Sequence, residues 1–356
     1  MHHQRRGSLD AFLQHSRGGV VRTSPVPQLR LDCGRELPRI TETLRQQVGE
    51  VLRRSGIVVA MSGGVDSSVC AALAVRAVGR ERVLGLALPE RESDPQSVAL
   101  ARSWAERLGV DFLVEDVTAI LAACRCYARR NAAVKRLVPE FGDDWRCKLV
   151  LEGGGLDSDR LNVCYLVVQA PGGAMRKLRL PAREFREIVA ATNFKQRVRA
   201  MLAYYHADRL QYAVLGTPNR LEYDQGFFVK GGDGLADLKA IAHLYKSQVY
   251  QLAEYLGVPE AVTRRTPTTD TYSLPQTQQE FFFSLPLEAL DLVLQARNEG
   301  KSATDAAVEL GYRPEQIERA YHAIERKRNG TRYLHQPPLL VEPVAEVAAG
   351  AAPGGD

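Results

Sequence analysis

The chain of 356 residues lacks long apolar runs and is poor in cysteine. No stretch approaches the roughly 20 consecutive apolar residues that a membrane-spanning helix needs. The first residues carry no apolar signal-peptide core, so we expect a cytoplasmic protein without a membrane partner. Six cysteines are too few for a disulfide framework in a chain of this length. Because 45% of the residues are hydrophobic, the chain can bury the core of one large domain or two small ones.

Strong positive charge is confined to the N-terminus. The formal net charge is +5, and residues 1–35 carry +4 of it, because six arginines there face only Asp10 and Asp32. The remaining chain is close to neutral, which argues against a nucleic-acid partner. Residues 1–35 show little periodicity, and we predict a disordered basic leader there. The Ala-, Pro- and Gly-rich residues 339–356 predict a disordered tail.

Residues 57–68, IVVAMSGGVDSS, predict a buried strand, a glycine turn and the start of a helix. The glycines let the backbone turn tightly and approach a ligand. The free N–H groups and the dipole of the helix N-terminus would attract an anion there. Hydroxyl groups at Ser62 and Ser67 add donors, and Asp66 places a carboxylate where a phosphate-bound Mg²⁺ would sit. The alternative is an ordinary strand–turn–helix link with a solvated aspartate, but the complete string favours a phosphate-binding loop.

Strands and helices alternate along the chain, which predicts an α/β fold with a doubly wound parallel sheet flanked by helices. The predicted strands are 57–61, 82–88, 112–114 and 212–215. Helices are predicted at 38–56, after residue 64, and at 97–108, 194–207 and 244–256.

The C-terminal part of the chain is predicted to be helical, at about 287–298, 302–310 and 314–328. The last two of these helices could form a helix-turn-helix. Glu315, Glu318 and Glu325 would then lie where DNA phosphates bind, so we do not expect DNA binding.

Residues 118–192 interrupt the alternation and are interpreted as an insertion. Within it, 160–170 and 175–180 are joined by Pro-Gly-Gly and predict a β-hairpin. Four of the six cysteines lie here, at positions 124, 126, 147 and 164. Their spacing matches no standard zinc finger, so we favour buried or incidental thiols over a metal site.

The loop at 62–68 resembles the pyrophosphate-binding loop of the N-type ATP pyrophosphatases, which cleave ATP between its α- and β-phosphates and adenylate a substrate. Residues 213–257 narrow the resemblance to NAD synthetases. They carry Gly-Thr-x-Asn-x-x-Glu, a Lys-x-Gly-Asp-Gly-x-x-Asp run and Leu-Tyr-Lys in the family's order. The chain is similar to this family over about 38–117 and 193–338. The resemblance implies an adenine nucleotide alpha hydrolase-like fold and a single synthetase domain over 36–338.

The resemblance also implies a role for each matching residue. Asp66 and Lys246 would be catalytic, and Asp66 and Glu222 would hold Mg²⁺ on the phosphates of ATP. The ATP site would comprise Ala60, Met61, Ser62, Gly63, Gly64, Val65, Asp66, Ser67, Thr217, Lys246 and Thr268. The dinucleotide substrate would contact Arg197, Lys230, Asp237, Arg326 and Lys327.

In the reaction that the resemblance implies, the nicotinate carboxylate of deamido-NAD attacks the α-phosphorus of ATP and releases pyrophosphate. Ammonia then attacks the acyl-adenylate, which gives NAD and AMP. A glutamine-hydrolysing domain needs a fold of roughly 150–250 residues of its own, so we expect free ammonia or a separate glutaminase subunit as the nitrogen source. The family also implies a homodimer. The apolar stripe from Ile40 to Leu52 could pack at its interface or inside one subunit.

Two features depart from the family pattern. Ala60 replaces a glycine, and Gln278-Gln279-Glu280 stands where Asp-Glu is expected. Together with the insertion at 118–192, they leave open a related amide ligase that acts on another carboxylic acid. A tRNA-thiolating enzyme is a further alternative, which would need a catalytic cysteine pair and a basic face.

Overall fold

The fold was analysed on a computed structural model that describes residues 29–153, 163–268, 271–283 and 287–344. A five-stranded sheet forms the centre, in the order β3-β2-β1-β7-β8, and every pair of neighbouring strands is parallel. Its strands are β1 (Gly56–Ala60), β2 (Val83–Ala87), β3 (Asp111–Val114), β7 (Tyr212–Gly216) and β8 (Leu238–Lys239). The four predicted strands are confirmed, and β8 is an addition at the edge.

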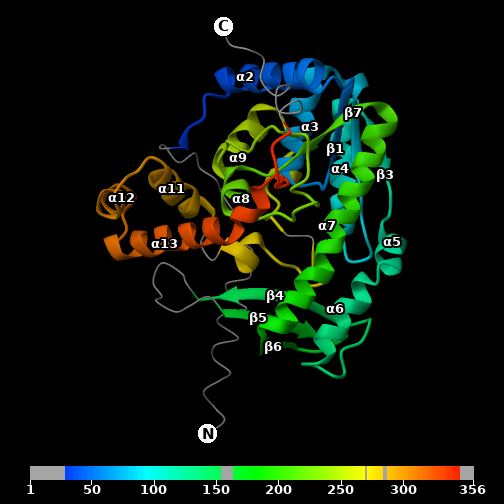
Figure 1. The fold of residues 1–356 in the computed structure, drawn as a ribbon, viewed down its shortest axis with the longest axis vertical. Coiled ribbons are helices and arrows are strands. Elements are labelled where there is room, and N and C mark those ends of the chain that lie inside the picture. The colour runs from blue at the N-terminus through cyan, green and yellow to red at the C-terminus, as the bar shows by residue number, and fades with distance from the viewer. Residues whose placement is uncertain (1–28, 154–162, 269–270, 284–286, 345–356) are drawn as a thin grey trace.

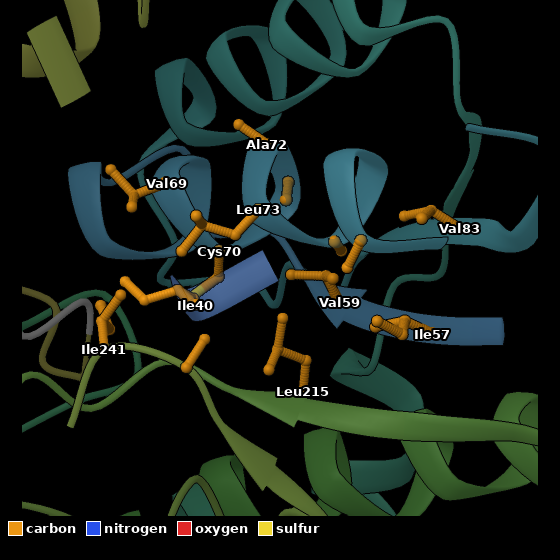
Figure 2. Close-up of a cluster of buried hydrophobic side chains, with 14 of the residues drawn as sticks. Ile40, Ile57, Val59, Val69, Cys70, Ala72, Leu73, Val83, Leu215 and Ile241 are labelled. Carbon is orange, nitrogen blue, oxygen red and sulfur yellow. The ribbon is translucent and has the colours of Figure 1, made fainter. Parts of the chain in front are cut away.

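Helices cover both faces of this sheet (Figure 1). One face carries α2 (Cys33–Gln46), α3 (Val65–Val78), α4 (Pro95–Leu108) and α9 (Lys246–Tyr255), and the other carries α5 (Thr118–Ala123), α6 (Cys126–Lys135) and α7 (Ala182–Leu210). Because side chains alternate along a strand, Ile57 and Val59 pack on the α3 side while Val58 packs on the α7 side. Figure 2 shows Val59 beneath Leu73 of α3, with Ile57 further along the same strand. The predicted doubly wound α/β fold is confirmed.

The first helix begins earlier than predicted. Asp32 caps α2 by accepting a hydrogen bond from a backbone N–H of its first turn, and Leu29 is 1% exposed. A disordered leader is therefore wrong for residues 29–35, while residues 1–28 lie outside the described residues. The helix continues as a π-helical turn, Gln47–Val51.

The apolar stripe of this first helix packs inside the subunit. Ile40, Leu44 and Val48 are buried in the same core cluster as α3 and α9. Figure 2 shows Ile40 beside Cys70 of α3. These three residues are therefore part of the core of one chain, whereas Val51 near the end of the stripe is 62% exposed.

A separate three-stranded antiparallel sheet lies at one end of the molecule (Figure 1). It contains β4 (Arg146–Glu152), β5 (Val163–Gln169) and β6 (Met175–Arg179). The predicted hairpin is the β5–β6 pair, and β4 was not predicted. The segment 118–192 also holds α5, α6 and the first part of α7, which begins twelve residues before the predicted start. Its early turns bury Ile188 and Ala191 at helical spacing.

The C-terminal part is helical, as predicted. It contains α11 (Leu287–Asn298), α12 (Ala303–Leu310) and α13 (Pro314–Thr331), which share one apolar cluster with Leu221 and Phe283. Shorter elements are α8 (Arg220–Gln225), α10 (Glu260–Thr263), a π-helical turn Gln279–Phe283 and the 3₁₀ turns Arg80–Arg82 and Arg332–His335. Across the described residues, no helix is both long and apolar enough to cross a membrane.

Candidate active site

A cavity of about 680 Å³ opens at the carboxyl ends of β1 and β7. The strand order reverses between these two strands, and parallel sheets bind ligands at such a point. The loop that follows β1 lines the cavity, with Ala60, Met61, Ser62 and Gly64. The loops after β2 and β7, the middle of α7 and the start of α9 line it as well.

The turn after β1 depends on Gly63. Its φ of +73° lies in the left-handed region, and an added Cβ would lie 2.4 Å from the carbonyl oxygen of Ser97. Gly63 is therefore a structural glycine beneath the loop, while Gly64 lines the cavity. Helix α3 then begins at Val65 without a side-chain cap. Its N-terminus lies beside the cavity as a site for an anion.

The predicted catalytic residues meet at this helix N-terminus. The Lys246 ammonium forms an ion pair with Asp66 Oδ2, and the Asn219 amide donates to Asp66 Oδ1 at 3.1 Å. Asn219 also caps α8, where its backbone N–H donates to Glu222 Oε2 at 3.2 Å. Three elements distant in sequence, α3, α8 and α9, thus bring Asp66, Glu222 and Lys246 together.

Burial and charge set the protonation of this cluster. Burial disfavours the charge of Lys246, but the Asp66 and Glu222 carboxylates outweigh it and hold the pKa of Lys246 above its usual value. Burial and the Asp66 carboxylate raise the pKa of Glu222 to about 7. Lys246 is therefore a fixed cation at 1% exposure, next to the helix N-terminus.

The same carboxylates fit a magnesium–nucleotide complex. Mg²⁺ in nucleotide sites is bound by one or two carboxylates together with phosphate oxygens. Asp66 and Glu222 both line the cavity and supply that number of hard oxygen ligands. Within the described ranges no group of three or more His, Cys, Asp or Glu side chains could hold a metal without a substrate.

The other end of the cavity holds three of the residues predicted for the dinucleotide, Arg197, Lys230 and Lys327. Arg197 of α7 donates from Nε to the Lys230 carbonyl oxygen at 3.3 Å. The Lys230 ammonium donates to the carbonyl oxygens of Tyr333 and Gln336, both at 2.8 Å. The 3₁₀ turn after α13 therefore holds Lys230 at the cavity rim, since Tyr333 also lines the cavity.

Lys327 lies at this end in an apolar environment. Its ammonium donates to the Phe282 carbonyl oxygen at 2.8 Å and lies 4.4 Å from the Phe282 ring centroid. Burial lowers the pKa of Lys327 to about 7. In contrast to Lys246, it has no carboxylate among the contacts that the structure shows for it.

The other predicted site residues divide into two groups. Val65, Ser67, Thr217 and Thr268 line the cavity. Gly63, Asp237 and Arg326 do not belong to the described residues that line it. Asp237 instead accepts hydrogen bonds from the Tyr204 hydroxyl and the Val214 backbone N–H, at 3.1 and 2.8 Å. Its role at the substrate stays a prediction.

From the sequence, no site role was predicted for three polar residues, although Gln278 was noted as a departure from the family pattern. Asn219 bridges Asp66 and Glu222, Arg265 lines the cavity and bonds Asp94 at the start of α4, and Gln278 donates to Glu222 Oε1 at 2.9 Å. The Asn-x-x-Glu spacing of a capping box would have indicated Asn219. No local pattern marks the other two, because each acts through a contact between distant segments.

The cysteines occupy different environments. Cys70, Cys126 and Cys147 are buried, and Cys33, Cys124 and Cys164 are partly buried. Burial raises the pKa of Cys126 and of Cys164 to about 11.

The chain is similar to known proteins in sequence and in fold. It matches the model of a family described as NAD synthase over residues 36–138 and 165–333. An NH(3)-dependent NAD(+) synthetase of Rhizobium rhizogenes is 52% identical over 316 residues, 89% of this chain and 95% of the relative. One of the same name from Rhizobium meliloti is 53% identical over 319 residues, 90% and 95% of the two chains.

Two solved structures share the fold. An NMN synthetase from Francisella tularensis has a TM-score of 0.60 and 21% identity, over 87% of this chain and 99% of that one. An NH3-dependent NAD synthetase from Campylobacter jejuni has a TM-score of 0.57 and 19% identity, over 88% and 100%.

Fold and sequence together define the class of protein: an α/β enzyme with a cavity at the carboxyl end of its parallel sheet. The chain belongs to the NAD synthase family, a family of ligases in NAD biosynthesis. The predicted family is confirmed. The family match includes α5 and α6 and resumes in β5, so residues 139–164 alone separate its two parts.

Proposed function

We propose that this protein is an ammonia-dependent NAD synthetase that adenylates deamido-NAD with ATP and amidates the product. The observation that carries the proposal is the cluster of Asp66 with the buried Lys246 and Glu222 at the N-terminus of α3. It lies in one cavity with Arg197 and Lys230. The Rhizobium relatives that carry this name are more than 50% identical over about nine-tenths of the chain.

The residues at the two ends of the cavity would have different roles in the reaction. The α3 N-terminus and Lys246 neutralise the negative charge on the β- and γ-phosphates, which leave as pyrophosphate. Arg197 and Lys230 hold the dinucleotide so that its carboxylate lies in line with the α-phosphorus. Mg²⁺, bound by Asp66 and Glu222, would add further charge neutralisation on the phosphates. No side-chain nucleophile is required, because the substrate carboxylate attacks in the first step and ammonia in the second.

A direct assay tests this proposal. Purified protein is incubated with ATP, Mg²⁺, ammonium chloride and deamido-NAD, and NAD and AMP are followed together. We expect equal amounts of both products, and none without deamido-NAD. AMP release with a different carboxylic acid, and none with deamido-NAD, would instead identify the related amide ligase. Glutamine in place of ammonium should give no NAD, unless a separate glutaminase subunit is added.

We also propose that the protein is a homodimer. Apolar side chains are exposed on the edge strand β3, at Leu113 and Val114, and on α7, at Met201 and Tyr205. An exposed apolar strand edge is usually covered by a partner. Sedimentation of the wild type and of Met201→Glu tests this: the wild type should sediment as a dimer and the variant as a monomer. A monomeric wild type would contradict the proposal.

A further inference from the structure

The loop that reaches the site from the C-terminal side, residues 271–283, is attached to the inserted strand β4. The Cys147 backbone N–H donates to the Ser273 hydroxyl at 2.9 Å, and the Leu274 N–H donates to the Cys147 carbonyl oxygen at 3.2 Å. The Gln276 amide donates to the Leu149 carbonyl oxygen. In Figure 1 the yellow segment that precedes α11 lies beside β4. Hydrogen bonds to β4 therefore hold this loop in place.

Lys148 of β4 fixes the loop through charge. Its ammonium donates to the Pro275 carbonyl oxygen at 3.1 Å and to both carboxylate oxygens of Glu280, at 3.3 and 3.2 Å. The Lys148 side chain is 9% exposed and that of Glu280 is 20% exposed. Glu280 in turn accepts from the Thr277 backbone N–H at 3.1 Å. A largely buried lysine that saturates its donors in this way holds both ends of the segment 275–280.

Gln278 lies inside the segment that this ion pair holds. Its backbone N–H donates to the Pro267 carbonyl oxygen at 3.2 Å, and its side-chain amide donates to Glu222 Oε1 at 2.9 Å. Gln278 is 9% exposed. Lys148 therefore bonds Glu280, Glu280 bonds the backbone of Thr277, and the next residue, Gln278, bonds a carboxylate of the nucleotide site.

Both partners in this series lie in segments that the family model or the family pattern does not match. Lys148 lies in residues 139–164, between the two parts of the family match. Gln278 and Glu280 lie where the family resemblance predicts Asp-Glu. The two departures contact each other, so each supplies the partner that the other needs.

From these contacts we propose that Lys148 is a positioning residue for the nucleotide site, which acts through Glu280 and Gln278 to orient Glu222 towards the phosphates of magnesium-bound ATP. The proposal rests on the proposed function. A carboxamide at 278 donates a hydrogen bond to Glu222 without adding a second negative charge beside it. That arrangement works only if the loop is held in place, which is what Lys148 does.

The test compares Lys148→Met with Lys148→Arg. Binding of ATP at increasing Mg²⁺ is measured by calorimetry without deamido-NAD, and the Mg²⁺ concentration for half-maximal NAD formation is measured separately. We expect Lys148→Met to raise both Mg²⁺ requirements by about tenfold, the size of one lost hydrogen bond to a charged group. Lys148→Arg should recover most of this. Lys177→Met, which removes a Glu152 ion pair on β6 of the same sheet, serves as the control and should leave both values unchanged.

A double-mutant cycle tests the route. If Lys148 acts through Glu280, Lys148→Met combined with Glu280→Gln should cost no more than either change alone. Gln278→Ala should raise the Mg²⁺ requirements in the same way. It serves as the test variant if Lys148→Met fails to fold. Unchanged Mg²⁺ requirements in a folded Lys148→Met protein, or additive losses in the double variant, would overturn the inference. A wild type that binds magnesium-ATP but forms no NAD would overturn the proposed function instead.

Discussion

The two ends of the cavity are built in different ways. The phosphate end uses one contiguous loop, residues 60–67, and two side chains that start helices α8 and α9. The acceptor end combines the middle of α7, the rim at Lys230, the 3₁₀ turn after α13 and the inserted sheet. A site made from a loop and helix ends carries a sequence signature, whereas a site made by packing distant segments does not.

The lysines of the two ends show the same contrast in electrostatics. Lys246 lies between two carboxylates and keeps its charge at all working pH values. Lys327 lies against Phe282 and Phe283 and has a pKa of about 7. Lys246 therefore gives one end of the cavity a permanent positive charge that can bind phosphate. Lys327 at the other end changes its charge near neutral pH.

The largest expected effect is at the phosphate end. Lys246→Met keeps the length of the side chain and removes its charge, which leaves Asp66 without its ion-pair partner. We expect kcat for NAD formation to fall by about 10²–10³, as for the loss of one group that stabilises transition-state charge. Far-ultraviolet circular dichroism should show the native fold. Lys301→Met, which removes an exposed ion pair with Glu309, is the control. A rate near that of the wild type would remove Lys246 from the catalytic site.

A smaller effect of a different kind is expected at the acceptor end. Arg197 is exposed and its guanidinium lines the cavity rim. Arg197→Ala should raise KM for deamido-NAD by about tenfold or more, since a hydrogen bond to a charged group contributes about 1.5–3 kcal/mol. KM for ATP should stay the same. Arg183→Ala on the same helix is the matched control. A change in both KM values would show that Arg197 does not act on the dinucleotide alone.

Neighbouring glycines test the phosphate loop itself. Gly63→Ala forces a side chain into φ +73° and against the Ser97 carbonyl oxygen, whereas a Cβ at Gly64 meets only the Ser62 hydroxyl at 3.4 Å. We expect Gly63→Ala to lower the free energy of unfolding by about 1–3 kcal/mol. Gly64→Ala should leave stability nearly unchanged and weaken ATP binding. Urea unfolding and nucleotide titration distinguish the two, and equal losses of stability would contradict the assignment.

The sequence predicted the phosphate end in some detail. The four main strands follow from their apolar runs, and the string from Ser62 to Ser67 indicated both the turn and the helix that follows it. Asp66, Glu222 and Lys246 come together as the family resemblance implied. Short-range patterns were sufficient because each of these residues sits at the end of a strand or helix.

The acceptor end could not be predicted in the same way. Strand β4 pairs with β5 across residues 154–162, and its alternation is interrupted by the buried Lys148. The contact of Gln278 with Glu222 joins residues 56 positions apart, and the early turns of α7 are buried against the inserted strands. Pairing over such separations leaves no periodic signal in one sequence.

The last expected effect depends on pH and concerns the charge of Lys327. The pKa of Lys327 is about 7 in the folded chain and has its usual value of 10.5 in the unfolded chain. Between these two pH values the unfolded chain binds one more proton, so the stability of the wild type should rise with pH across this window. Lys327→Met removes the titrating group, so the stability of the variant should rise less with pH across this window.

Urea unfolding at pH 7 and at pH 9.5 measures this difference. The variant should gain most over the wild type at the lower pH, where the folded wild type must bury a charge or give up a proton. Lys301→Met removes an exposed lysine and should follow the wild type at both pH values. A parallel pH dependence in Lys327→Met and the wild type would mean that the Phe282 ring and carbonyl oxygen keep Lys327 charged. The two ends of the cavity would then be alike in charge and differ only in how they are assembled.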